Sequence, residues 1–189
     1  MNFRCLFYNI NKMSIDNDIY RSEDYELSED DIMRITDNKT KLILYSDLEQ
    51  VDNINEILNP YGCCVILYQL EQNVGHYICL IKHKNNTLEF FDPYGMNIDE
   101  ELKYSKYNLR RHRGVVTPHL TALIDKSNYK LLVNDNKLQK FKEHTQTCGR
   151  WVSLRIRFKD VSLEKFIKLF THNKCYDGDF WVSAMTLLI

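Results

Sequence analysis

Short apolar runs in the middle of the chain predict a sheet that is buried on both faces. The runs are Cys63 to Gln69, His76 to Lys82 and Thr87 to Phe91, and polar or turn residues separate them. Near-continuous apolar runs of this length are typical of strands covered on both sides. Lys84-Asn85-Asn86 predicts a hairpin between the second and third runs. Antiparallel pairing would bring His76, at the start of one strand, and Asp92, after the end of its neighbour, to the same edge.

Apolar positions at helical spacing predict helices on both sides of these strands. Ser28 and the three acids after it resemble a helix N-terminus that leads into Ile32 and Ile35. A second helix is predicted over Leu48 to Leu58, ended by Pro60. The remaining predicted elements are a helix over 120–123, a strand over 129–133, a helix after Ser162 and a C-terminal helix that begins near Asp177 or Asp179.

The stretch after Cys148 is ambiguous when it is taken alone. Val152, Leu154 and Ile156 alternate with Ser153, Arg155 and Arg157. A period of two is typical of a strand, so the pattern by itself favours a strand over 149–158.

Size and composition indicate one folded domain with an appendage. The chain has 189 residues, 44% of them apolar, and a formal net charge of −1, so the whole protein is not electrostatically committed to nucleic acid. We expect an acidic N-terminal extension over 1–27 and a domain over 28–189. The N-terminus has no signal-peptide core, and no apolar run approaches the roughly 20 residues that span a bilayer. These features lead us to expect an intracellular protein with no membrane association.

Charge is distributed unevenly along the chain. Eight acids lie between Asp16 and Asp31 against one base, whereas the segment Lys103 to Arg113 has five bases and no acid. Solvated faces are the simplest interpretation. The alternatives are an acidic arm that docks on a basic patch, or phosphate binding by Lys103–Arg113 together with Arg155 and Arg157.

The cysteines point to thiol chemistry rather than to metal binding. The six are Cys5, Cys63, Cys64, Cys79, Cys148 and Cys175, and none form Cys-x-x-Cys. We therefore expect no metal site and mostly core thiols. Cys64 and Cys79 lie in apolar runs, where burial raises a thiol's pKa, so Cys148 is the best candidate for a reactive thiol.

His76, Asp92 and Cys148 could form a catalytic set in the order imidazole, carboxylate, thiol. A thiol nucleophile needs a base and a group that orients the base. Each residue has an ordinary alternative: a core histidine, a turn at Asp-Pro-Tyr-Gly and an inert buried cysteine. Their joint order and spacing favour catalysis.

These residues resemble adenain, the adenovirus maturation protease, and its relatives in virophages, large DNA viruses and Polinton-type transposons. The resemblance rests on His76 followed by an aromatic residue, on Phe91-Asp92-Pro93-Tyr94-Gly95, and on a glutamine before Cys148-Gly149. Proteases that process SUMO and other ubiquitin-like proteins are more distantly similar. The resemblance implies a papain-like α+β fold of the adenain type. In that fold a central mixed sheet is flanked by helices, and Cys148 lies at a helix N-terminus, which replaces the strand predicted for 149–158.

The resemblance also implies a glutamine that completes the oxyanion hole with the Cys148 backbone N–H. The family places it six or seven residues before the cysteine, where this chain has Phe141 and Lys142. Gln139 and Gln146 are the alternatives. We select Gln139, because Gln146 is too near Cys148 in the chain, and we infer a lengthened loop over 140–147.

The implied function is a cysteine endopeptidase that cleaves viral capsid or core precursors during virion maturation. We expect a monomer in virions and in the cytoplasmic viral factory. The chemistry requires no cofactor, although the resemblance raises DNA, a peptide or the N-terminal extension as an activator. The alternatives are a deubiquitinase- or deSUMOylase-like protease that acts on host conjugates, and a catalytically silent structural virion protein.

Overall fold

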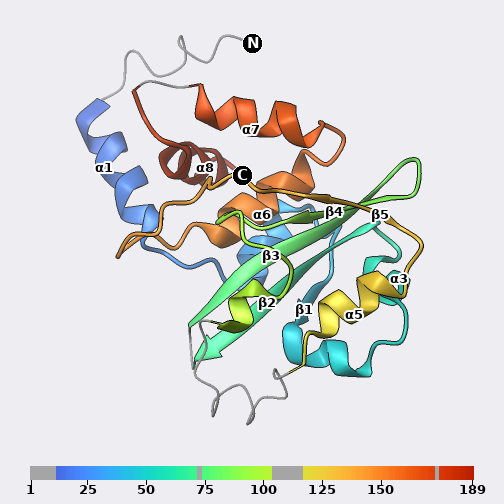
Figure 1. Cartoon of the computed structure of the whole chain (residues 1–189). Helices are drawn as coiled ribbons and strands as arrows, with labels where there is room; N and C mark the ends of the chain where they lie inside the picture. The colour runs from blue at the N-terminus through green and yellow to red at the C-terminus, as the bar shows by residue number, and fades with distance from the viewer. Residues whose placement is uncertain (1–11, 72–73, 104–116, 173–174) are drawn as a thin grey trace.

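The computed structural model describes residues 12–71, 74–103, 117–172 and 175–189, and its centre is a five-stranded mixed sheet (Figure 1). The strands follow one another in sequence order across the sheet. They are β1 (Leu42–Leu44), β2 (Cys63–Glu71), β3 (Val74–His83), β4 (Thr87–Phe91) and β5 (Lys130–Val133). The central strands β2, β3 and β4 pair antiparallel, whereas the outer strands β1 and β5 pair parallel to their neighbours.

The predicted burial of both sheet faces is confirmed. Successive side chains of a strand point to opposite faces, and here the two sets enter two separate cores. One core contains Cys63, Val65, Cys79, Ile81 and Phe91, and the other contains Cys64, Ile66, Ile78, Leu80 and Phe90. Because both faces are covered, the strands are apolar throughout rather than alternating.

The predicted hairpin joins β3 to β4. Asn85 and Asn86 both have positive φ, at 58° and 56°, a backbone conformation that asparagine tolerates better than most residues. The hairpin sets a register in which Cys79 lies opposite Phe91. The chain leaves β4 at Asp92, close to the start of β3, as the sequence predicted.

Helices cover the two faces unequally (Figure 1). On one side lie α6 (Cys148–Arg157), α7 (Leu163–Thr171), α8 (Gly178–Leu187), α2 (Glu29–Ile35) and α1 (Lys12–Glu23), and on the other lie α3 (Ile54–Leu58), α5 (His119–Asp125) and the 3-10 helix η2 (Tyr45–Gln50). The short 3-10 helix η3 spans Glu100–Lys103. Ser28, Ser162 and Asp177 form the N-caps of α2, α7 and α8, as predicted.

The prediction of a single helix over Leu48 to Leu58 is wrong. The chain forms η2 and then α3, with an interruption at Val51 to Asn53. Asn53 accounts for the break, because its side chain accepts from the backbone N–H of Asn55 and it forms a capping box with Glu56. A strong N-cap inside the apolar period therefore starts a new helix there.

The alternation of apolar and polar residues after Cys148, taken alone, predicted a strand, but the structure has the helix α6 there. Nearly every residue of α6 is buried, including Ser153 and Arg155. A helix surrounded on all sides has no solvent face and therefore no period of 3.6 to detect in the sequence. Arg155 is fully buried against Glu89, which excludes it from phosphate binding.

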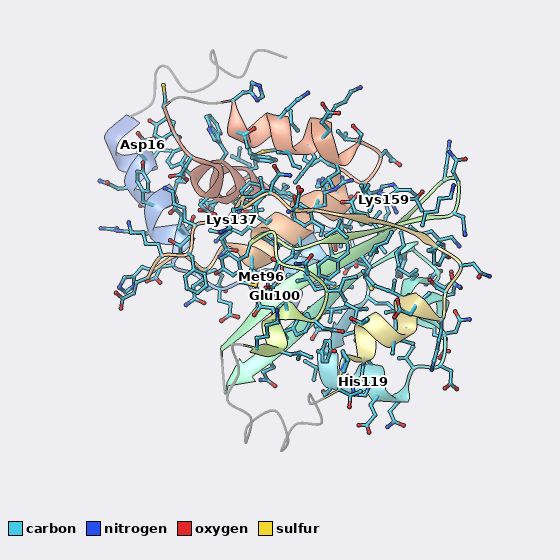
Figure 2. All side chains as sticks on the ribbon, viewed as in Figure 1. Asp16, Met96, Glu100, His119, Lys137 and Lys159 are labelled. Carbon is cyan, nitrogen blue, oxygen red and sulfur yellow. The ribbon has the colours of Figure 1, made fainter. Side chains whose placement is uncertain are left out.

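The N-terminal helix α1 packs against α8 and reaches the loop before Cys148. Asp16, labelled in Figure 2, accepts from the Tyr176 hydroxyl at 2.7 Å. The carbonyl oxygen of Glu23 accepts from the backbone N–H of Gln146 at 2.7 Å, and that of Ser22 accepts from Arg150 Nη2 at 2.9 Å. The boundary between an extension and a domain at residues 27 and 28 stays a prediction.

Two further predictions concern membranes and nucleic acid. Among the described ranges, none of the helices combines the length and the apolar character that crossing a membrane requires. The basic segment Lys103 to Arg113 lies outside the described residues except for Lys103, which pairs with Glu100.

Candidate active site

His76 and Asp92 lie close together at the end of the sheet where β3 begins and β4 ends. His76 Nε2 lies 3.1 Å from Asp92 Oδ1, and both side chains are buried. The same Asp92 oxygen accepts from the Tyr94 backbone N–H at 2.7 Å, so the turn after β4 fixes the carboxylate. An imidazole held at Nε2 presents Nδ1 on its other side.

Cys148 is the first residue of α6 and lies within hydrogen-bonding reach of His76. Burial alone would lower the pKa of His76, but hydrogen bonds with Asp92 and with Cys148 raise it well above its usual value. With Nε2 held by Asp92, Nδ1 is the ring nitrogen left for the thiol. A thiol beside a base at the positive end of a helix is the arrangement in which thiol nucleophiles are activated.

The nucleophile candidate is nearly enclosed. Only 5% of Cys148 is exposed. The next residue, Gly149, is closely packed, because a Cβ there would lie 3.2 Å from the Leu27 side chain and 3.4 Å from Tyr77. The segment that follows α1 therefore packs against the first turn of α6.

Tyr94 is a site residue to which the sequence gave no role beyond its place in a motif. Its ring stacks on His76 with centroids 4.7 Å apart, and burial followed by the nearby Cys148 raises the pKa of its hydroxyl. On its other side Tyr94 contacts the ring of Phe141, which is 82% exposed. The rings of His76, Tyr94 and Phe141 thus form a row of contacts that extends from the catalytic candidate to the surface.

The two candidate glutamines have different surroundings. Gln139 is buried, and its Nε2 donates to the Tyr94 hydroxyl at 3.0 Å and to the Thr145 carbonyl at 3.2 Å. Its buried Oε1 has no hydrogen-bond partner among the described residues. Gln146 is exposed. Gln139 therefore lies beside the site, but both of its amide hydrogens are already engaged.

A third buried acid, Glu101, also approaches His76. Its Oε1 lies 3.7 Å from His76 Nε2, and the sequence gave no signal for it because no motif or apolar period includes it. His76, Asp92 and Glu101 place one ligand atom each within 4.8 Å of one another. Among the described residues these three have the spacing that a divalent ion would require, and the expectation of no metal site stays a prediction.

The other described cysteines are placed unfavourably for nucleophilic chemistry. Burial raises the pKa of Cys63, Cys64 and Cys79. This agrees with their position in the apolar strands. Cys175 is exposed, and Cys5 lies outside the described residues.

The fold and the site together define an α+β protein with a histidine, an aspartate and a cysteine gathered at the N-terminus of a buried helix. The predicted architecture of a central mixed sheet flanked by helices, with Cys148 at a helix start, is confirmed. No family model matches the chain. The chain is 38% identical over 146 residues to the uncharacterised protein V9 of Sputnik virophage, a match covering 77% of this chain and 83% of that protein. It belongs to the family of that virophage protein.

Solved structures with partial likeness include two proteins of different origin. The crystal structure of a protease of ASFV aligns with 88% of this chain and 68% of its own, at 14% identity and a TM-score of 0.46. ChlaDub1 from Chlamydia trachomatis aligns with 90% of this chain and 87% of its own, at 10% identity and a TM-score of 0.41.

Proposed function

We propose that this protein is a cysteine endopeptidase in which Cys148 is the nucleophile, His76 the base and Asp92 the orienting carboxylate. The observation that carries the proposal is that the buried His76 ring is 3.1 Å from Asp92 and also lies within hydrogen-bonding reach of Cys148. Base, orienting group and nucleophile in hydrogen-bonded series are the requirements for acyl transfer through a thiol.

The reaction follows from this geometry. The Cys148 thiolate attacks the scissile carbonyl carbon, and the carbonyl oxygen becomes an oxyanion. As the C–N bond breaks, His76 gives its proton to the leaving amine, and Cys148 remains as a thioester. Water attacks the thioester and loses a proton to His76, which releases the acid product and restores the thiolate–imidazolium pair.

The developing oxyanion requires donors that are already in position. The Cys148 backbone N–H is one, because it lies at a helix N-terminus where no intrahelical partner exists. We propose Gln139 as the second. Its amide donates to the Tyr94 hydroxyl in the present state, so substrate binding would have to replace the Tyr94 hydroxyl or the Thr145 carbonyl as its acceptor.

We expect substrates with small residues next to the scissile bond, because only 5% of Cys148 is exposed and a bulky side chain beside the reacting carbonyl would need more space. Membership in a family with a virophage protein suggests the substrate class: capsid or core precursors, cleaved during virion maturation in the viral factory or in the particle.

The direct experiment is co-expression of the protein with the capsid precursor of the same virus, followed by mass spectrometry of the capsid protein. We expect cleavage next to small residues with the native chain and none with Cys148→Ala. Cys63→Ala, which removes a buried thiol on the sheet, is the matched control and should leave cleavage intact. A thiol-directed probe should label Cys148 at neutral pH in the native chain, and His76→Ala should abolish that labelling.

Other outcomes would assign the protein differently. Turnover of ubiquitin- or SUMO-type conjugates without cleavage of capsid protein would favour a protease of host modifiers. Absence of labelling at Cys148 and of cleavage would favour a structural virion protein and refute the proposal.

A further inference from the structure

Three buried side chains with metal-ligating atoms lie together at the end of the sheet where β3 begins. His76, Asp92 and Glu101 come from β3, from the residue after β4 and from the 3-10 helix η3, and none is more than 5% exposed. Each offers one ligand atom, an imidazole nitrogen or a carboxylate oxygen, and these atoms all lie within 4.8 Å of one another. Three separate segments of the chain therefore build a compact set of one imidazole and two carboxyl groups.

The spacing of these atoms fits a zinc ion. His76 Nε2 lies 3.1 Å from Asp92 Oδ1 and 3.7 Å from Glu101 Oε1. Zinc binds imidazole nitrogen and carboxylate oxygen at about 2.0–2.2 Å in a tetrahedron, which sets neighbouring ligand atoms about 3.3–3.6 Å apart. The two observed separations lie on either side of that range, so small shifts of the side chains would place the atoms at three corners of the tetrahedron.

Unused acceptor atoms on the carboxyl groups are a second observation that points to a cation. Asp92 contacts the imidazole through Oδ1, whereas its buried Oδ2 has no hydrogen-bond partner in the described part of the chain. Glu101 has His76 as its only polar partner among the described residues. Its neighbour Glu100, labelled in Figure 2, is instead hydrogen-bonded to Asn97. Because buried polar atoms normally have partners, the two carboxyl groups are short of a donor or a cation.

Charge balance favours a divalent ion at this place. Among the described residues, His76 is the only basic group paired with Asp92 or with Glu101. Buried charges are tolerated where they are paired or coordinate a metal, and a divalent cation held by two carboxylates and a neutral imidazole has no net charge. Magnesium and calcium prefer oxygen ligands throughout, whereas zinc readily takes imidazole nitrogen. The mixed nitrogen and oxygen set therefore favours zinc.

We propose that His76, Asp92 and Glu101 bind a zinc ion that reversibly inhibits the protein. The ion replaces the proton between His76 Nε2 and Asp92 Oδ1, and that proton is released to solvent. Zinc binds the neutral imidazole, so the remaining ring proton is on Nδ1. The ring then cannot accept a proton from Cys148, and the thiol is not activated. Zinc binding is independent of the proposed function, whereas the inhibition rests on it.

This site differs from a simpler one in which zinc is held by the thiol and the imidazole. Among the described residues, the group of ligand atoms around His76 includes two carboxyl groups and no cysteine. Removal of the Cys148 thiol should therefore leave zinc binding intact, whereas a site made by Cys148 and His76 would lose it. The ion is an inhibitor, so the proposal departs from the expectation of no metal site and leaves the chemistry itself without a cofactor.

Zinc binding is measured by isothermal titration calorimetry on Cys148→Ala, with Zn²⁺ alone as the probe. We expect a single ion per chain with micromolar affinity. Glu101→Gln in this background should weaken binding at least about 100-fold, since loss of even an outer-shell partner of a metal costs about 10–100-fold in affinity. Glu100→Gln is the matched control, because it changes a partly exposed acid on the same 3-10 helix, and it should bind zinc as before.

Absence of zinc binding by Cys148→Ala, or equal affinity with and without the Glu101 carboxylate, would refute the inference. Thermal unfolding covers the case in which Glu101→Gln folds poorly. Zinc should raise the melting temperature of Cys148→Ala, because a ligand that binds only the folded state stabilises it, and Asp92→Asn in that background should remove most of the increase. A full increase in the Asp92→Asn variant would equally refute the site.

The inhibition is tested on the native chain with the capsid precursor as substrate. We expect zinc to stop cleavage and a chelator to restore it, and Glu101→Gln to need at least about 10-fold more zinc for the same fractional inhibition. Inhibition that is equally strong in Glu101→Gln would refute the inhibitory role. Zinc binding by Cys148→Ala without any cleavage by the native chain would support the site and refute the protease, so the two proposals fail separately.

Discussion

The ion pair between Arg155 and Glu89 connects the helix that carries Cys148 to the central sheet, and its removal is the most quantitative test of this fold. Arg155 Nε and Nη2 donate to the two oxygens of Glu89 at 2.7 and 2.8 Å, and both side chains are 0% exposed. Arg155 also donates to the Phe158 carbonyl at 2.7 Å. Cys148 and Arg155 are seven residues apart and therefore lie on the same face of α6, so the pair sets where the thiol lies along the sheet.

Removal of one partner leaves the other as a buried unpaired charge, which costs about 3–5 kcal/mol of unfolding free energy. We expect Glu89→Leu to lose stability at the upper end of this range, because Arg155 keeps only the Phe158 carbonyl as a hydrogen-bond acceptor and the Phe166 ring, 5.2 Å from its guanidinium carbon. Arg155→Met should lose stability at the lower end of this range, because Glu89 keeps the hydrogen bond with His83 Nε2 at 2.8 Å. In Glu89→Leu/Arg155→Met no charge is stranded, so its stability should lie within about 2 kcal/mol of the native chain.

The assay is urea unfolding followed by circular dichroism. With a slope of about 2 kcal/mol/M, each single variant should lose roughly 1.5–2.5 M in midpoint, and the double variant less than about 1 M. Arg157→Met is the control on the same helix, because Arg157 is partly exposed against Asp37 and Ile35. A loss below about 1 kcal/mol in Arg155→Met, or additive losses in the double variant, would contradict the buried pair.

Three further results are expected. Gln139→Ala should lower kcat about 100-fold through loss of an oxyanion donor, whereas Gln146→Ala should leave it within about 2-fold; equal losses would reject Gln139 as the donor. Burial, with help from Asp177 and Asp179, raises the pKa of Glu23 to about 7, so its contribution to stability is full below pH 4.5 and is lost as the pH rises to about 7. Thermal unfolding of Glu23→Gln should therefore depend less on pH across that window, and an unchanged profile would contradict this placement. Deletion of residues 1–25 removes the acceptors of Gln146 N–H and Arg150, and should lower both the melting temperature and probe labelling of Cys148; unaltered values would show that α1 is dispensable.

The central sheet could be predicted from the sequence because its signals are local. Three strands and one hairpin could be predicted from the apolar runs, their lengths and the Asn-Asn turn. The hairpin alone brings His76 close to Asp92, so this contact needs no distant part of the chain. The helix caps at Ser28, Ser162 and Asp177 could likewise be predicted from the sequence, since a cap is formed within one turn of the chain.

Other features depended on contacts between distant parts of the chain. The helix after Cys148 could not be predicted from its own pattern, because the sheet and the other helices bury all of its sides and a buried Arg155 is indistinguishable in sequence from an exposed one. The cap at Asn53 is an exception, because it is local, yet the continuous apolar spacing over Leu48 to Leu58 concealed it. Glu101 and Tyr94 reach His76 only through the course of the chain after β4. The sequence thus determined which residues could do the chemistry, whereas the tertiary structure decided which groups surround the histidine, because long-range packing brings Glu101 and Tyr94 to its ring.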